Sequence, residues 1–359
     1  MITDNNRTFH SDKMQPTVAI RADANRNIGS GHAMRCISIA QQIEALGGSV
    51  RFAVSDGESK AFVEKRGFDA TVLHGSSNRF GKHEARALAE FCESCDPVSV
   101  LVDSYGVDGA FFSELRARTR GSVRIAYLDD LYTFEKGHHT TPIARPVDYA
   151  INYCFDADEY EYQIAYEGSD THCCIGSRFA PLRPWFVSKD RVEKPFVENV
   201  LVTTGATNDD NMLEKMAEGC LRALPSARVD VVVGGEASFN LPSRENVRTH
   251  TGLTDLSTLM STSDLALSAA GTTLYELCAI GVPTIAVPIV ENQLPNARGF
   301  RKMGLGLVVD ISDHFVDRIA STVEELATDC AKRQDESNRM RSSVDGLGAE
   351  RIAKLLINA

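Results

Sequence analysis

The sequence of 359 residues lacks any apolar run that could cross a membrane. Its longest apolar stretch, residues 277–290, is interrupted by Gly281, Pro283 and Pro288, so it is too short and too broken to span a bilayer. The first ten residues, MITDNNRTFH, are polar and lack the apolar region of a secretory signal. We therefore expect a cytoplasmic protein without stable membrane association.

An excess of basic residues is also missing. Lysine and arginine total 38 against 49 aspartates and glutamates, which gives a formal net charge of −11. Because a net negative charge repels phosphate backbones and anionic lipids, we expect no binding to nucleic acid. A phosphorylated small molecule remains compatible, since local backbone N–H groups can hold its phosphates whatever the overall charge.

No complete set of metal ligands accompanies the nine cysteines. Cys92 and Cys95 have the spacing of a zinc or redox pair, but no second pair and no matching histidines accompany them. The clusters at residues 172–174 and 138–139 are equally isolated. We therefore expect reduced thiols, no metal and no cofactor.

The pattern that is present is a repeated alternation of short apolar runs and amphipathic segments. The chain length allows about two domains, and buried runs separated by helices indicate parallel strands covered on both faces. The sequence predicts strands at 17–21, 49–54, 98–103, 123–129, 199–203, 228–233, 246–249, 264–268 and 283–288, with helices between them. Residues 156–195, rich in tyrosine, proline and charge, are interpreted as a break with a hinge at 183–195.

This pattern predicts an α/β chain of two Rossmann-like domains that face a cleft. We expect a loose tail at 1–15, a first domain at 16–185 and a second at 195–359, with the last helix able to pack back on the first domain. Ligands of open parallel sheets bind beyond the carboxyl ends of the strands, so we expect the site in the cleft.

The first strand leads into a glycine-containing turn, RADANRNIGSGHAMRC at residues 21–36. Gly29 and Gly31 permit a tight turn, and His32 then falls at a helix N-terminus, where the partial positive charge disfavours imidazolium. A neutral imidazole facing a cleft suits a general base. The alternative is that His32 caps the helix or packs in the core. The third glycine of a dinucleotide fingerprint is missing.

Polar residues also close two later strands of the first half. In VDSYG, Tyr105 is placed to bond a base or a water, although Asp103 can equally cap the next segment of the chain. In LDD, Asp129 and Asp130 either orient the site or belong to a solvated loop.

The second half contains a strand, a glycine turn and a helix in SAAGTTLYE, residues 268–276. Gly271, Thr272 and Thr273 offer N–H groups and hydroxyls at a helix start, which makes a phosphate site without lysine or metal. Glu276 lies one turn further on and can chelate a ribose diol. An ordinary N-capped helix with an early glutamate fits equally well. Residues 205–211 and 291–293 are further polar clusters at strand ends.

Taken together, the motifs RADxxxxIGxGHxMRC, VDSYG, LDD, LRP, SAxGTTxxELCAxGVP and ENQ resemble the PseG/SpsG family. Its members are UDP-2,4-diacetamido-2,4,6-trideoxy-β-L-altropyranose hydrolases of pseudaminic acid biosynthesis, similar in fold to MurG-type glycosyltransferases, the GT-B fold. The resemblance runs from about residue 18 to residue 301. Two departures, Trp185 in place of a family glutamate and TGAT at 204–207 in place of GGSD, leave the sugar open.

The resemblance implies metal-independent hydrolysis of a UDP-sugar with inversion and cleavage of the C1–O bond. His32 matches the catalytic base, Tyr105 a tyrosine that orients the water or the histidine, and Glu276 the carboxylate at the ribose. The remaining substrate-binding positions are Gly31, Asp23, Arg183, Gly271, Thr272, Thr273, Asn292 and Gln293. Three alternatives are a GT-B glycosyltransferase with a hydroxyl acceptor, a non-catalytic nucleotide-sugar binding protein and a zinc hydrolase.

Overall fold

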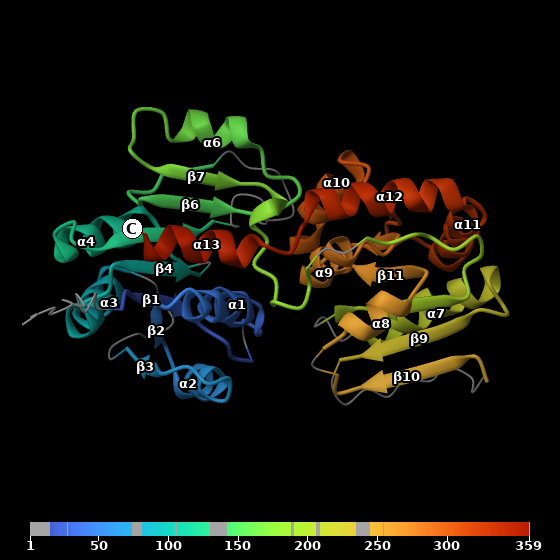
Figure 1. Ribbon diagram of the computed structural model, residues 1–359, viewed down its shortest axis with the longest axis horizontal. Helices are drawn as coiled ribbons and strands as arrows, with labels where there is room; N and C mark the ends of the chain where they lie inside the picture. Colours follow the sequence, from blue (N-terminus) through green and yellow to red (C-terminus); the bar gives the residue numbers. More distant parts are fainter. Residues whose placement is uncertain are drawn as a thin grey trace, which may run out of the picture.

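Two parallel sheets lie side by side in the computed structural model (Figure 1). It describes residues 15–26, 28–73, 81–104, 106–129, 142–187, 190–205, 209–234, 245–253 and 255–358. The first sheet has the order β3-β2-β1-β4-β5-β6-β7 and the second β10-β9-β8-β11-β12-β13. This arrangement confirms the predicted α/β class with two Rossmann-like domains.

The first domain uses seven strands and five α-helices within the described residues. The strands are β1 (Thr17–Ala22), β2 (Ser49–Val54), β3 (Ala70–Val72), β4 (Ser99–Asp103), β5 (Arg124–Leu128), β6 (Tyr149–Asn152) and β7 (His172–Ile175). The helices are α1 (Gly31–Ala45), α2 (Gly57–Glu64), α3 (Lys82–Cys95), α4 (Gly109–Thr119) and α6 (Glu159–Ala165), followed by the 3-10 turn η2 (Ser177–Phe179).

The second sheet contains β8 (Asn199–Thr203), β9 (Arg228–Val233), β10 (Val247–Thr251), β11 (Leu265–Ala269), β12 (Thr284–Val287) and β13 (Leu307–Val308). Its helices are α7 (Asp210–Ala223), α8 (Ser257–Thr262), α9 (Thr272–Ile280), α10 (Leu294–Lys302), α11 (Phe315–Thr328) and α12 (Cys330–Ser343), with the 3-10 turn η4 (Glu291–Gln293). The last helix, α13 (Gly348–Ile357), packs against α1, and Ser99 Oγ donates to the Leu356 carbonyl at 2.8 Å. Figure 1 shows this helix beside the first sheet.

In both sheets the order in which the strands are added reverses at one parallel strand pair. The chain builds β1, β2 and β3 outward on one side and then returns to place β4 beside β1; the second sheet does the same with β8 and β11. Ligands of such sheets bind beyond the strand ends at this switch point. The loops after β1, β4 and β11 are therefore positioned to build a site.

Most predicted elements lie within a few residues of the observed ones, and the error is concentrated between residues 149 and 195. The segment interpreted as a break contains α6 and β7, and the short strands β3, β6 and β13 were also missed. Four-residue strands such as YAIN and HCCI carry too few residues to show a period, and their tertiary partners stabilise them instead. In the described part of the chain, no helix combines the length and apolar character needed to cross a bilayer.

A close backbone contact joins the two domains beside β6. In α10, a Cβ added to Gly299 would lie 2.2 Å from the carbonyl carbon of Phe155. The Phe155 ring also stacks on Tyr275 of α9, with ring centroids 4.2 Å apart and planes 4° apart. Only a residue without a side chain allows this approach.

We expect Gly299→Ala to destabilise the protein by about 2 kcal/mol or more, because the added methyl group must displace backbone and not a flexible side chain. Thermal unfolding measures the change. Gly57→Ala is the control, since a Cβ at this first residue of α2 meets nothing within 4 Å. Equal melting temperatures for the two variants would contradict the contact.

Candidate active site

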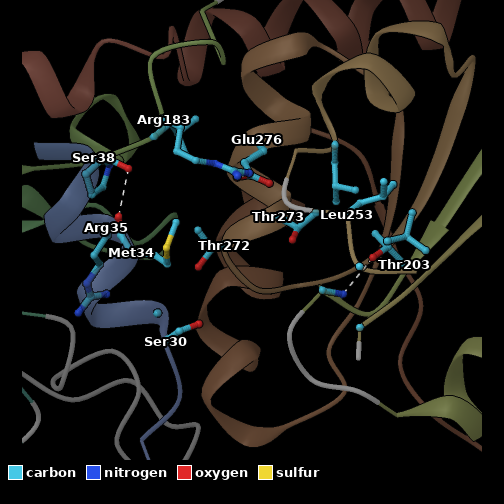
Figure 2. A pocket seen from close by; sticks show the side chains of 18 of the residues that line it. Ser30, Met34, Arg35, Ser38, Arg183, Thr203, Leu253, Thr272, Thr273 and Glu276 are labelled. Atoms are coloured by element: carbon cyan, nitrogen blue, oxygen red, sulfur yellow. Dashed lines mark hydrogen bonds and ion pairs between the residues drawn. The ribbon is translucent and has the colours of Figure 1, made fainter. Parts of the chain in front are cut away.

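A cavity of about 370 Å³ lies between the two domains (Figure 2). This volume is within the range of small-molecule sites. The first domain contributes α1 and the segment after η2, and the second contributes the ends of β8 and β9 and the start of α9. The lining residues are Ser30, Gly31, Met34, Arg35, Ser38, Pro181, Leu182, Arg183, Thr203, Gly205, Val232, Val233, Gly234, Gly252, Leu253, Leu256, Thr272, Thr273 and Glu276.

His32 is the second residue of α1 and lies just behind the cavity wall formed by Gly31 and Arg35. Its Nδ1 is 2.6 Å from Oδ1 of Asp103, the last residue of β4, and only 6% of its side chain is exposed. Asp103 reaches α1 because β4 is the strand placed beside β1 at the switch point. A proton on Nδ1 is donated to the carboxylate, which leaves the lone pair on Nε2, the arrangement that a general base needs.

Arg35, one helical turn after His32, contacts the other side of the same carboxylate. Its Nε donates to Asp103 Oδ2 at 2.6 Å, and its Nη2 donates to Oδ1. Nη2 is also 3.0 Å from Nδ1 of His32. Because both nitrogens carry protons in this tautomer, the carboxylate between them is the acceptor of both. The Cys36 thiol donates to Oδ2 at 3.4 Å.

Asp103 stays ionised although it is buried, because of these partners. Burial by itself raises the pKa of a carboxyl, but the guanidinium of Arg35 and the ring of His32 outweigh it and hold the pKa of Asp103 well below its usual range. Burial raises the pKa of Cys36 well above that of a free thiol, so this group stays a neutral donor. The result is a buried, ionised carboxylate that orients His32.

The start of α9 forms the opposite wall. Gly271 is its N-cap, and Thr272 and Thr273 are its first two residues and line the cavity. The first N–H groups of a helix have no partners within the helix and carry the positive end of its dipole, which suits phosphate. Gly205, with φ +60°, approaches so closely that a Cβ there would lie 3.1 Å from Thr273 Oγ1.

Glu276 and Arg183 form an ion pair inside the cavity. Arg183 Nη2 donates to Glu276 Oε1 at 2.8 Å, and Figure 2 shows the two side chains pointing toward one another. Burial raises the pKa of Glu276, and the guanidinium opposes that rise. The same guanidinium lies over the rings of Trp185 and Phe186, at 5.1 and 5.0 Å from their centroids. At position 185, where the resembling family has glutamate, the tryptophan thus places an aromatic ring against the Arg183 guanidinium.

Besides His32, which lies behind the wall, and Gly271, three further predicted positions do not line the cavity. Asp23 lies after β1, where it pairs with Arg21 at 2.7 Å and its Oδ1 accepts from the Ser55 N–H at 2.7 Å. Gln293 is buried, and its Oε1 accepts from the Ile289 N–H at 2.9 Å. Asn292 is exposed on η4. Their geometry offers no support for a contact with substrate, since Asp23 and Gln293 hold the chain itself.

Of the remaining predictions, Gly31, Arg183, Thr272, Thr273 and Glu276 line one cavity, and Gly271 caps the helix that lines it. Tyr105 lies outside the described residues. The described part of the chain contains no group of three or more histidine, cysteine, aspartate or glutamate residues arranged to hold a metal ion.

Sequence reasoning gave no role to Arg35 and only an alternative capping role to Asp103. A signal for each was present. Asp103 ends a largely apolar and fully buried strand, and an acidic residue there must find a partner. Arg35 is three residues after His32 and therefore on the same helix face. The missing information was the strand order, because the sequence does not show that β4 lies beside β1.

We expect Asp103→Asn to destabilise the protein by about 3 kcal/mol at pH 7, because it leaves the Arg35 guanidinium buried without its counter-charge. Asp103 has a lowered pKa in the folded state, so its contribution is present above the unfolded value near 4 and is lost as the pH falls below it. The difference in the free energy of unfolding between the wild-type protein and Asp103→Asn should therefore shrink only below about pH 4. Denaturant unfolding from pH 7 to pH 3 measures it.

The control for this variant is Asp310→Asn. That carboxylate pairs with Arg301 at the surface, where both side chains are about half exposed, and it should contribute less than about 1 kcal/mol. An equal loss of stability in the two variants would contradict the role given to Asp103.

The second half of the chain matches the model of the glycosyltransferase family 28 C-terminal domain over residues 199–356. A Helicobacter pylori protein named pseudaminic acid cytidylyltransferase and UDP-2,4-diacetamido-2,4,6-trideoxy-beta-L-altropyranose hydrolase is 23% identical over 297 residues, which cover 82% of this chain and 48% of that protein. The spore coat polysaccharide biosynthesis protein SpsG of Bacillus subtilis is 25% identical over 202 residues, 53% of this chain and 60% of that one. The chain spans about half the length of the curated relatives it matches.

Among solved structures, MurG of Acinetobacter baumannii aligns with a TM-score of 0.64 at 12% identity, over 96% of this chain and 100% of that chain. At this identity the likeness establishes the fold, and it confirms the predicted GT-B arrangement. With its motifs, its two parallel sheets and these relatives, the chain has the GT-B fold and is related to the PseG/SpsG and MurG-like proteins, and its second half matches the glycosyltransferase family 28 C-terminal domain.

Proposed function

We propose that this protein is a UDP-sugar hydrolase that releases UDP and a free sugar. The observation that carries the proposal is the buried Asp103–His32 pair directly behind the wall of a cavity shared by the two domains. The name of the Helicobacter pylori relative supports a diacetamido-trideoxy sugar and a place in pseudaminic acid biosynthesis.

The nucleotide half of the substrate is assigned to the second domain, residues 195–359. The diphosphate lies at the start of α9, where the N–H groups of Thr272 and Thr273 and the helix dipole face the cavity. Glu276 receives the ribose hydroxyls, and Arg183 then exchanges part of its pairing with Glu276 for the diphosphate. The first domain, residues 16–185, supplies the base and the sugar side.

In the chemical step, a water attacks the anomeric carbon on the face opposite UDP. His32 Nε2 takes one proton from that water while the C1–O bond breaks, and the electron pair of that bond leaves with the diphosphate. Asp103 keeps the other ring proton on Nδ1 and stabilises the imidazolium that forms. UDP is a good leaving group, so the growing charge needs only the α9 N–H groups and Arg183.

The burial of His32 favours water as the nucleophile. A ring with 6% of its side chain exposed can be reached by a water more easily than by a sugar or lipid hydroxyl. The proposed binding of the nucleotide and the proposed chemical step use neither a metal nor a cofactor. UDP-sugar is the partner that this scheme requires.

The second candidate is a GT-B glycosyltransferase that uses the same donor and a hydroxyl acceptor. The match to the glycosyltransferase family 28 C-terminal domain favours it, because that half of the chain would bind the nucleotide in either enzyme. A non-catalytic nucleotide-sugar binding protein would need Glu276 but not His32.

The base is tested by His32→Asn with a panel of UDP-sugars and no acceptor present. We expect the wild-type protein to release UDP, and the variant to lose about 10²- to 10⁴-fold in turnover while its UDP affinity stays the same. UDP release and isothermal titration calorimetry measure the two quantities. His172→Asn, an exposed histidine on β7, should leave both unchanged.

Release of UDP only when an acceptor is added would favour the transferase, and no release at all with tight UDP binding would favour the binding protein. Undiminished turnover in His32→Asn would remove this residue from the mechanism.

The ribose contact is tested by Glu276→Gln, which keeps the size of the side chain and removes its charge. We expect UDP affinity to fall about tenfold, the size of one hydrogen bond to a charged group. Glu218→Gln is the control, because Glu218 pairs with Arg222 on the exposed face of α7. An unchanged dissociation constant for UDP would show that Glu276 does not hold the ribose.

A further inference from the structure

A four-residue segment after β6, residues 153–156, fastens the first domain to the second. The Phe155 ring stacks on Tyr275, as described, and Tyr153 meets the same ring edge-on with centroids 5.3 Å apart. The Cys154 thiol donates to Asn296 Oδ1 at 3.1 Å. Arg298 Nε donates to Asp156 at 3.0 Å. The three partners Tyr275, Asn296 and Arg298 belong to α9 or α10, so this segment moves with the second domain.

The same segment also touches the candidate catalytic group. Arg35 Nη1 donates to the Tyr153 hydroxyl at 2.8 Å, and both side chains are buried. Through its other nitrogens Arg35 holds the Asp103 carboxylate, which in turn accepts from His32. An unbroken series of contacts therefore runs from Tyr275, the residue before Glu276, to the imidazole.

We propose that Tyr153 is a positioning residue that makes the orientation of His32 depend on the contact between the two domains. The inference rests on the proposed function for its consequence in turnover, but the geometry that it describes can be measured without a substrate. Arg35 is a long side chain with a fixed planar head, and two anchors at different edges restrain it more than one does. With the Tyr153 anchor removed, Arg35 and Asp103 gain freedom, and the imidazole loses its fixed direction.

The rate at which a general base takes a proton in the transition state depends steeply on the direction in which its accepting nitrogen points. A shift of this kind lowers kcat and leaves substrate affinity intact, since neither Tyr153 nor Asp103 lines the cavity. It also gives the nucleotide-binding helix a physical connection to the base, because α9 carries both Tyr275 and Glu276.

The test compares Tyr153→Phe with Tyr166→Phe. Both substitutions remove one hydroxyl from a buried tyrosine, and the hydroxyl of Tyr166 accepts only from the Arg145 backbone N–H among the hydrogen bonds described. Tyr153→Phe keeps the ring that packs on Tyr275. The first readout is the NMR signal of the His32 Nδ1 proton in protein labelled with 15N-histidine, assigned among the nine histidines by its loss in His32→Asn.

We expect Tyr153→Phe to shift or broaden this signal and Tyr166→Phe to leave it unchanged. The second readout is turnover. We expect kcat to fall about tenfold in Tyr153→Phe, because the loss of one hydrogen bond to a charged group corresponds to about that factor. KM and UDP affinity should stay within about twofold of the wild-type values. In an Asp103→Asn background the same substitution should change kcat by less than about twofold, because its effect passes through the carboxylate.

A second variant, Phe155→Leu, loosens the stack on Tyr275 without touching any hydroxyl, and we expect it to move the His32 signal in the same way. An unmoved signal in Phe155→Leu, or in Tyr153→Phe, would overturn the inference, and so would equal losses of kcat in Tyr153→Phe and Tyr166→Phe. A moved signal in a protein that hydrolyses no UDP-sugar would support the positioning role and reject the proposed function.

Discussion

The candidate site depends on one buried carboxylate. Asp103 lies at the end of a strand with no exposed residue, and it keeps its charge only because Arg35 and His32 both donate to it. A buried charge without partners is strongly unfavourable, so these three side chains hold each other in place. With a neutral imidazole the group carries no net charge, and its geometry directs Nδ1 of the ring to the carboxylate.

The topology of the fold brings this group to the cavity. In each sheet the strand order reverses beside the first strand, and the two reversal points lie on opposite walls of the space between the domains. One wall presents the start of α1 and the other the start of α9, so two helix N-termini converge on one volume. The proposed function uses this arrangement, with the diphosphate held by one domain and the proton-transfer group supplied by the other.

The contact through residues 153–156 limits how independently the two domains can move. Aromatic stacking, a backbone approach at Gly299 and the Arg298–Asp156 pair fix that segment to α9 and α10. Trp185 adds a local difference from the resembling family, since it faces Arg183 as an aromatic surface where a carboxylate would have competed with Glu276 for the same guanidinium.

The sequence by itself determined the α/β class, most helices and strands, and the two glycine turns that begin α1 and α9, because hydrophobic period and turn chemistry are local properties. It also indicated His32, Glu276 and the threonines as neighbours of one cleft. Only the tertiary structure decided that Asp103 and Arg35 hold His32, that Asp23 and Gln293 bond the chain itself, and that β6 and β7 complete the first sheet. Those contacts join residues far apart in the chain, and the strand order that creates them leaves no periodic trace in the sequence.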